Sequence, residues 1–161
     1  MPEGTAGSRF RIVTTRRIVL DANILIRAVL GTRVRELIEE YGEDTSFFSP
    51  DLAFAEAARH LPTIAGKRGA DPAPLLDSLD RLRVVVEAVP IEVIAPLEPV
   101  AMARIGARDP MDWPMVAAAL TLDCPIWTED RDFFGAGVAT WTSDLVEIYL
   151  RGDGEAGAVT N

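Results

Sequence analysis

Carboxylate side chains recur along this chain at places where several of them could hold one metal ion. Asp21 ends a short apolar run, and Glu56 lies in a segment that otherwise consists almost entirely of Ala, Leu and Phe. Asp109 and Asp112 lie three positions apart, and the segment 128–132 carries further acids. Two carboxylates about 4 Å apart repel each other by roughly 4 kcal/mol at an effective dielectric constant near 20. We therefore expect a cation among these acids.

The available ligand types favour a hard cation. The sequence has one histidine, His60, and one cysteine, Cys124, so it offers no Cys/His cluster for zinc. It has no GxxxxGKS/T or GxGxxG loop for phosphates, and the single histidine without a GxSxG motif argues against a serine hydrolase triad. We interpret His60 as a surface or capping residue. An all-oxygen site suits Mg²⁺ or Mn²⁺, which accept carboxylates, water and phosphate oxygens.

The composition predicts one globular domain without disulfides. Of the 161 residues, 48% are apolar and 25% are charged, which suffices for a core without cross-links. A single cysteine excludes a disulfide within the chain and fits a reducing cytoplasm. The N-terminal segment lacks the apolar region of a signal peptide, and charged and polar residues interrupt the apolar run at 18–30. We therefore expect neither a signal peptide nor a membrane span.

The charge balance bears on nucleic-acid binding in two opposite ways. The net charge of −9 argues weakly against tight nonspecific binding to nucleic acid. However, every basic residue except Lys67 is an arginine, and the flat guanidinium fork suits phosphate oxygens. A bias in genome composition explains this arginine usage at least as well.

The elements that must position the acids alternate between strands and helices. Short β-branched or aromatic runs predict strands at 18–20, 45–48, 84–89, 125–128 and 138–141. Helical periodicity and capping residues predict helices at 22–30, 32–41, 50–61, 71–82, 96–107, 110–122 and 142–150, with 62–70 as a loop or helix boundary. This alternation indicates a parallel sheet covered by helices on both faces and joined by right-handed crossovers. We expect a flexible arm at 1–16, which includes a possible short strand at 10–13, a domain at 17–151 and a flexible tail at 152–161.

The predicted elements bring some of the acids together and leave alternatives for others. In an open parallel sheet the chemistry gathers at the carboxyl ends of the strands, where Asp21 and Asp130 lie. If their two strands are neighbours, these acids converge. Asp21 could instead serve only as the N-cap of the helix that follows. Glu56 could face a cavity, or it could lie at the solvent edge of its helix and pair with Arg59 or His60.

The two acidic segments near residues 109 and 130 each offer more than one candidate. Asp109 and Asp112 can share one face of a helical turn, and we favour Asp112 as the site residue with Asp109 as a cap or supporting contact. Asp130 and Asp132 share a side if their segment stays extended, with Glu129 opposite and in solvent.

Four segments in this order resemble those of a PIN domain, the small nuclease fold that includes VapC-type toxins. They are IVLDANILI, LAFAEAARHL, DPMDWPMVAAAL and TEDRDFF, and the resemblance extends over about 17–150. It implies a three-layer α/β/α fold with a short, mainly parallel central sheet. It also implies a set of catalytic and metal-binding acids, namely Asp21, Glu56, Asp112 and Asp130. The supporting residues that it implies are Asn23, Asp109, Thr128 and Asp132.

The resemblance further implies a function and partners. The chain would be a cytoplasmic ribonuclease that hydrolyses RNA phosphodiester bonds with Mg²⁺ or Mn²⁺. It could also be the toxin of a toxin–antitoxin pair, with an antitoxin and a second copy of itself as candidate partners. Arg27, Arg33 and Arg108 are candidates for holding the RNA backbone. Trp113 is the aromatic residue best placed to touch a base, although Trp113, Trp127 and Trp141 are more readily interpreted as core residues. Glu129 departs from the family pattern, because many relatives have a polar uncharged or basic residue at that position.

Two other functions fit parts of the pattern. A non-catalytic PIN-like module that binds RNA or a protein would share the fold, but it would not need all four acids. A haloacid-dehalogenase-type phosphatase also has an acid after its first strand, but its DxD pattern requires an acid at the position of Asn23.

Overall fold

Five parallel strands form the centre of the molecule, in the spatial order β3-β2-β1-β4-β5. The computed structural model describes residues 15–152, so the predicted strand at 10–13, nearly all of the arm at 1–16 and the tail beyond residue 152 lie outside the described residues. The strands are β1 (Arg16–Leu20), β2 (Thr45–Pro50), β3 (Val86–Val89), β4 (Ile126–Trp127) and β5 (Thr140–Trp141). Every neighbouring pair is parallel, as predicted.

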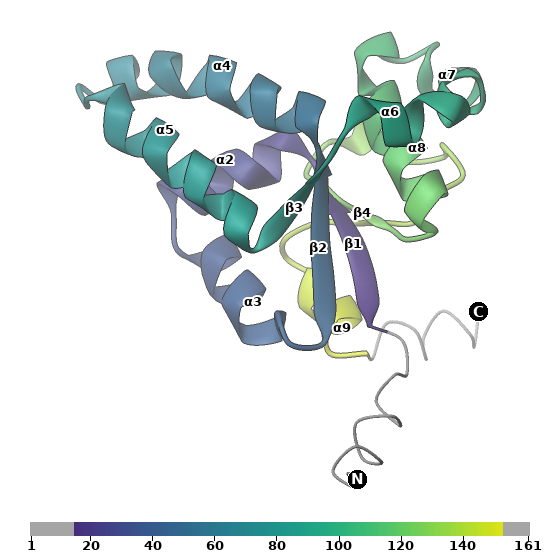
Figure 1. The fold of residues 1–161 in the computed structure, drawn as a ribbon, viewed down its shortest axis with the longest axis horizontal. Coiled ribbons are helices and arrows are strands. Elements are labelled where there is room, and N and C mark those ends of the chain that lie inside the picture. The colour runs from purple at the N-terminus through teal and green to yellow at the C-terminus, as the bar shows by residue number, and fades with distance from the viewer. Residues whose placement is uncertain (1–14, 153–161) are drawn as a thin grey trace, which may run out of the picture.

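Helices cover both faces of this sheet, with α2 to α5 on one side and α6 to α8 on the other (Figure 1). The α-helices are α2 (Ala22–Leu30), α3 (Arg33–Tyr41), α4 (Asp51–Lys67), α5 (Pro72–Arg81), α6 (Ile91–Ile94), α7 (Glu98–Ile105), α8 (Trp113–Leu122) and α9 (Val146–Leu150). Short 3-10 helices occur at η1 (Leu82–Val84), η2 (Ala95–Leu97), η3 (Pro110–Asp112) and η4 (Arg131–Phe133). The predicted three-layer α/β/α architecture is therefore confirmed.

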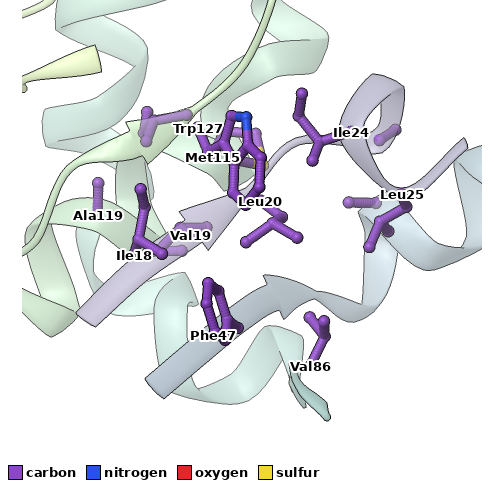
Figure 2. Packing of buried hydrophobic residues seen from close by; sticks show 14 of the residues in the cluster. Ile18, Val19, Leu20, Ile24, Leu25, Phe47, Val86, Met115, Ala119 and Trp127 are labelled. Carbon is purple, nitrogen blue, oxygen red and sulfur yellow. The ribbon is translucent and has the colours of Figure 1, made fainter. Parts of the chain in front are cut away.

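The central strand β1 is buried on both faces, as a parallel sheet with helices on each side requires. Ile18, Val19 and Leu20 have no solvent-exposed surface. Figure 2 shows these side chains between Phe47 of β2 and Trp127 of β4, whose ring centroids are 6.5 Å apart. This apolar packing fixes the strand that ends at Asp21. Within residues 15–152, none of the helices has the length and apolar character needed to cross a membrane.

Helix α4 extends further than its sequence pattern predicts. The segment 62–67 continues α4, with Pro62 inside the helix, instead of forming a loop. Proline removes one intrahelical hydrogen bond and is therefore a poor helix residue. Leu61 and Ala65 nevertheless continue the buried stripe of α4, and their packing outweighs this local preference.

The helices predicted at 50–61 and 142–150 have Ser49, Thr142 and Ser143 at their expected starts, but none of these side chains caps a helix. β2 runs through Pro50, and the Ser49 hydroxyl donates a hydrogen bond of 2.7 Å to the Leu20 carbonyl, so Ser49 ties β2 to β1 and caps no helix. The last helix, α9, begins at Val146 without a side-chain cap from Thr142 or Ser143. The sequence pattern also did not predict α6, a single turn of four residues before α7.

Candidate metal centre

Pairing of β1 with β4 places Asp21 beside Thr128 at the carboxyl ends of these strands. The Thr128 hydroxyl donates to Asp21 Oδ2 at 2.7 Å, and the Ala22 amide donates to Oδ1 at 2.8 Å. The Asn23 amide group also reaches Oδ2, at 3.2 Å. Asp21 therefore caps α2 and at the same time lies at the strand end where the acids gather. Its side chain is buried and its position is fixed by three donors.

Thr128 and Asn23 connect the turn after β1 with the loop after β4. The Asp130 amide donates to Thr128 Oγ1 at 2.9 Å, and the Glu129 amide donates to Asn23 Oδ1 at 3.3 Å. The Asn23 amide group also lies 3.4 Å from Thr128 Oγ1. Both residues thus hold the backbone that carries Asp130.

Asp109 and Asp112 have different local roles. The Asp109 carboxylate accepts a hydrogen bond of 3.0 Å from the Met111 amide and caps η3. Asp112 is the residue before α8, but its carboxylate caps nothing. Its Oδ2 atom is buried and has no hydrogen-bond partner within the described part of the chain. A buried carboxylate oxygen without a donor is costly, so Asp112 is the acid of this pair that requires a further partner.

Three carboxylates come close enough together to bind one cation. Asp112, Asp130 and Asp132 each offer an oxygen, and these oxygens lie within 4.8 Å of one another. Asp130 also accepts a hydrogen bond of 2.9 Å from the Asp132 amide, which turns the loop into η4. This group includes neither Asp21 nor Glu56. The Glu56 side chain is 48% exposed and lies 3.9 Å from His60, on the surface of α4.

The negative charges of all the predicted acids nevertheless act on the centre. Burial raises the pKa of Asp112 to about 7, and the charges of Asp109, Asp21, Asp130 and Glu56 add to this effect. Burial likewise raises the pKa of Asp21 to about 6, although its hydrogen bonds with Thr128 and Ala22 act in the opposite direction. Glu56 and Asp130 raise it further. A cation at this edge of the sheet would relieve the repulsion and favour the ionised forms.

The three arginines considered for RNA binding have different surroundings. Arg27 is exposed in the last turn of α2. Arg33 forms an ion pair of 2.9 Å with Glu147 of α9. Arg108 donates from Nη1 to the Asp132 carbonyl at 2.7 Å and also to the Phe134 carbonyl. Two of the three guanidinium groups therefore already have partners within the chain.

Glu129 is held by the backbone, contrary to the prediction that it lies in solvent. It is half-buried, and its Oε2 atom accepts a hydrogen bond of 2.8 Å from the Ser143 amide. Trp113 packs partly against the core, which is the interpretation that the sequence favoured, whereas Phe134 is 51% exposed. Phe134 follows Asp132 by two positions and is thus the exposed ring beside the acidic loop.

Sequence patterns did not reveal the contacts that hold this loop. Arg104 and Arg108 are one helical turn apart, and Gly135 and Gly137 alternate in the loop, but nothing in the sequence indicates that these distant segments touch. The arginines contact backbone carbonyls, which carry no residue-specific signal. The one available hint is the pair of glycines directly after an acidic loop.

The chain shares its fold and its sequence pattern with known proteins. The family model of the PIN domain matches residues 19–151. PAE2754 from Pyrobaculum aerophilum superposes with a TM-score of 0.65 at 16% sequence identity, over 86% of this chain and 91% of its own. VapBC2 from Rickettsia felis was solved bound to a DNA fragment from its promoter. It superposes with a TM-score of 0.63 at 10% sequence identity, over 78% of this chain and 98% of its own.

A third solved structure has a similar relationship to this chain. FitAcB from Neisseria gonorrhoeae superposes with a TM-score of 0.57 at 18% identity, over 78% of this chain and 97% of its own. At such low identities these likenesses show a common fold. Among curated proteins, none matches the sequence. Because the family model spans most of the chain, the protein belongs to the PIN domain family.

Proposed function

We propose that this PIN-domain protein is a metal-dependent ribonuclease that hydrolyses RNA phosphodiester bonds with Mg²⁺ or Mn²⁺. The observation that carries the proposal is Asp112 Oδ2, a buried oxygen without a hydrogen-bond partner among residues 15–152. Asp130 and Asp132 each place a carboxylate oxygen within 4.8 Å of a carboxylate oxygen of Asp112. Membership of the PIN domain family supports a nuclease that cleaves by hydrolysis.

The residues present fit a divalent cation of this kind. They offer only oxygen ligands, and one carboxylate oxygen of Asp112 has no hydrogen-bond partner among the described residues. The metal-binding catalytic set in this proposal is Asp21, Glu56, Asp112 and Asp130, with Asp132 as a further oxygen ligand of the ion or a hydrogen-bond acceptor for its water. When bound, the ion would lower the pKa of a water molecule and offset the charge that develops on the phosphate.

The protein's own residues would prepare this reaction by fixing the positions of the acids. Thr128 and the Ala22 amide hold the Asp21 carboxylate in one orientation. Asp109 caps the turn that leads to Asp112. Glu56 lies on α4 with an exposed side chain that is accessible to the substrate, and its charge acts on both Asp21 and Asp112.

The expected substrate is single-stranded RNA. Arg27 is exposed and, unlike Arg33 and Arg108, has no side-chain partner among the described residues, so it would hold a phosphate. The exposed ring of Phe134 offers a face on which a base can stack. VapBC2 was solved with promoter DNA, and FitAB was likewise solved bound to a DNA fragment. We propose by analogy that this chain is the toxin of such a pair, with a small antitoxin as partner, and that it acts in the cytoplasm and can form a homodimer.

Cleavage of a labelled single-stranded RNA tests the proposal. The wild-type protein should cleave with Mn²⁺ or Mg²⁺ and stop when EDTA removes the metal. Asp112→Asn should lose at least a hundredfold in rate, because it removes a charged ligand. Asp123→Asn is the matched control, since Asp123 is exposed at the left-handed end of α8, a conformation that asparagine also adopts. Metal-independent cleavage, or equal rates for both variants, would contradict the proposal, and RNA binding without cleavage would favour the non-catalytic module.

A further inference from the structure

Two arginines from the end of α7 and the loop after it bind the segment that follows Asp130. Arg104 Nη1 donates to the Gly137 carbonyl at 3.0 Å and to the Ala136 carbonyl at 3.3 Å. Arg108 Nη1 donates to the Asp132 carbonyl at 2.7 Å and to the Phe134 carbonyl. The two guanidinium groups are thus hydrogen-bonded to four carbonyls between residues 132 and 137. These contacts fasten the acidic loop to the segment that precedes Asp112.

The loop conformation is suited to these contacts. Gly135 and Gly137 both have φ near +85°, a region that side chains with a Cβ rarely adopt. A Cβ on Gly135 would lie 2.9 Å from Arg108 Nη2, and a Cβ on Gly137 would overlap Arg104 Nη1. Glycine at these two positions therefore both permits the turn and leaves room for the two guanidinium groups.

The contacts of Arg108 bear directly on the spacing of the metal-binding oxygens. Arg108 precedes Asp109, whose carboxylate caps the turn leading to Asp112. The Arg108 guanidinium donates a hydrogen bond to the backbone carbonyl of Asp132. One side chain therefore connects the two segments whose carboxylates approach within 4.8 Å, although 24 positions separate Arg108 from Asp132 in the sequence.

We propose that Arg108 is a positioning residue of the metal centre. It holds Asp132 and Asp130 against Asp112 so that their oxygens are already placed for one divalent cation. This inference rests on the proposed metal-dependent function and adds to it a residue that touches neither metal nor substrate. When no cation is present, repulsion among the carboxylates tends to move the loop that carries Asp130 and Asp132 away from Asp112. The hydrogen bonds from Arg108 to this loop oppose that movement.

The same geometry explains why lysine would be a poor replacement. A guanidinium presents several N–H donors in one rigid plane, whereas an ammonium group is a compact charge on a flexible stem. Arg108→Lys would keep the positive charge near the acids but lose the planar group that donates hydrogen bonds to two carbonyls. A purely electrostatic role predicts that lysine suffices, and a positioning role predicts that it restores metal affinity only in part.

Calorimetric titration of Mn²⁺ into the full chain tests the proposal without measuring cleavage. Arg108→Ala should raise the Kd for Mn²⁺ at least tenfold, and Arg108→Lys should give an intermediate value. Gly135→Ala leaves Arg108 in place but displaces its guanidinium, and it should raise the Kd in the same direction. Arg83→Ala is the matched control, because Arg83 is also exposed but contacts Asp51 and Asp80 on another part of the surface.

Urea unfolding without metal separates positioning from a general loss of stability. If Arg108→Ala lowers stability no more than Arg83→Ala but weakens Mn²⁺ binding tenfold, the positioning role stands. An unchanged Kd in Arg108→Ala overturns it, as does full restoration by lysine. Failure of the wild-type chain to bind Mn²⁺ overturns the proposed function itself, and this outcome is distinct from wild-type binding that is insensitive to Arg108.

Discussion

The Thr128 hydroxyl donates a hydrogen bond of 2.7 Å to Asp21 Oδ2, across a sequence separation of 107 residues. Both side chains are buried, and the same hydroxyl accepts a hydrogen bond from the Asp130 amide. One hydroxyl therefore links the first predicted acid to the backbone of the last. The N-terminal and C-terminal parts of the candidate site meet at this hydroxyl.

Replacing Thr128 by valine should destabilise the fold. Thr128→Val keeps the shape of the side chain but removes a donor to a carboxylate, and hydrogen bonds to charged groups contribute about 1.5–3 kcal/mol. We expect a loss of this size in the free energy of unfolding, measured with urea at pH 7.5. Thr45→Val is the control: Thr45 is also buried, but its hydroxyl has no partner in the described part of the chain, so stability should stay constant or rise. Equal losses in both variants would contradict the assigned role.

Divalent metal should stabilise the wild-type protein through Asp112. A ligand at about a hundred times its Kd adds about 2.7 kcal/mol to the free energy of unfolding. We expect the Tm to rise with Mg²⁺ or Mn²⁺, and this rise should disappear in Asp112→Asn. The variant should also be more stable than the wild type without metal at pH 8, because it lacks one of several repelling charges. Thermal scans across millimolar metal check both points, and an undiminished metal effect in Asp112→Asn would exclude Asp112 as a ligand.

The metal-free protein should become less stable as the pH rises from about 4 to about 7. The pKa values of Asp21 and Asp112 are raised from 3.8 to about 6 and about 7, so the folded state holds more protons than the unfolded state in this interval. The free energy of unfolding then falls with increasing pH, and the contribution is lost once the pH exceeds the folded pKa values. Urea titrations from pH 4.5 to 8 measure the slope. Asp112→Asn should reduce the dependence of the free energy of unfolding on pH. A steeper or unchanged slope in this variant would refute the raised pKa of Asp112.

Removing the exposed ring of Phe134 should weaken RNA binding but not metal binding. Stacking of a base on an aromatic side chain contributes about 1–3 kcal/mol, so Phe134→Ala should raise KM about tenfold or more. Its kcat, its Kd for Mn²⁺ and its Tm should change little, because the ring is half-exposed. Val84→Ala is the control, since Val84 is 86% exposed on η1 and distant in sequence from the acids. A KM equal to that of the control would leave Phe134 without a role in binding.

Local patterns predicted the order and type of most elements. Asp71 and Pro72 mark the start of α5, and the β-branched run before Asp21 marks β1. These signals succeed because caps and periodicity act within a few residues. They fail at Pro62, where packing of the following residues prolongs α4, and at Ser49, whose hydroxyl bonds to a neighbouring strand.

The sequence predicted which residue types form the candidate metal centre, but it did not predict most of the contacts among them. The pairing of β1 with β4 had to be assumed before Asp21 and Asp130 could be placed at one edge. The choice between Asp109 and Asp112 depended on which carboxylate finds a backbone donor, and sequence patterns leave that open. Arg108 looked like a ligand for RNA, but its partners are backbone carbonyls that no pattern encodes.

The wide sequence separation between Asp21 and Thr128 has a consequence for synthesis of the chain. The ribosome makes β1, β2 and β3 well before β4, so a growing chain has Asp21 and Glu56 long before it has Thr128, Asp130 or Asp132. Until those residues emerge, Asp21 lacks one of its three hydrogen-bond donors, and Asp112 lacks its two neighbouring carboxylates. The candidate metal centre is therefore complete only after most of the chain has been synthesised.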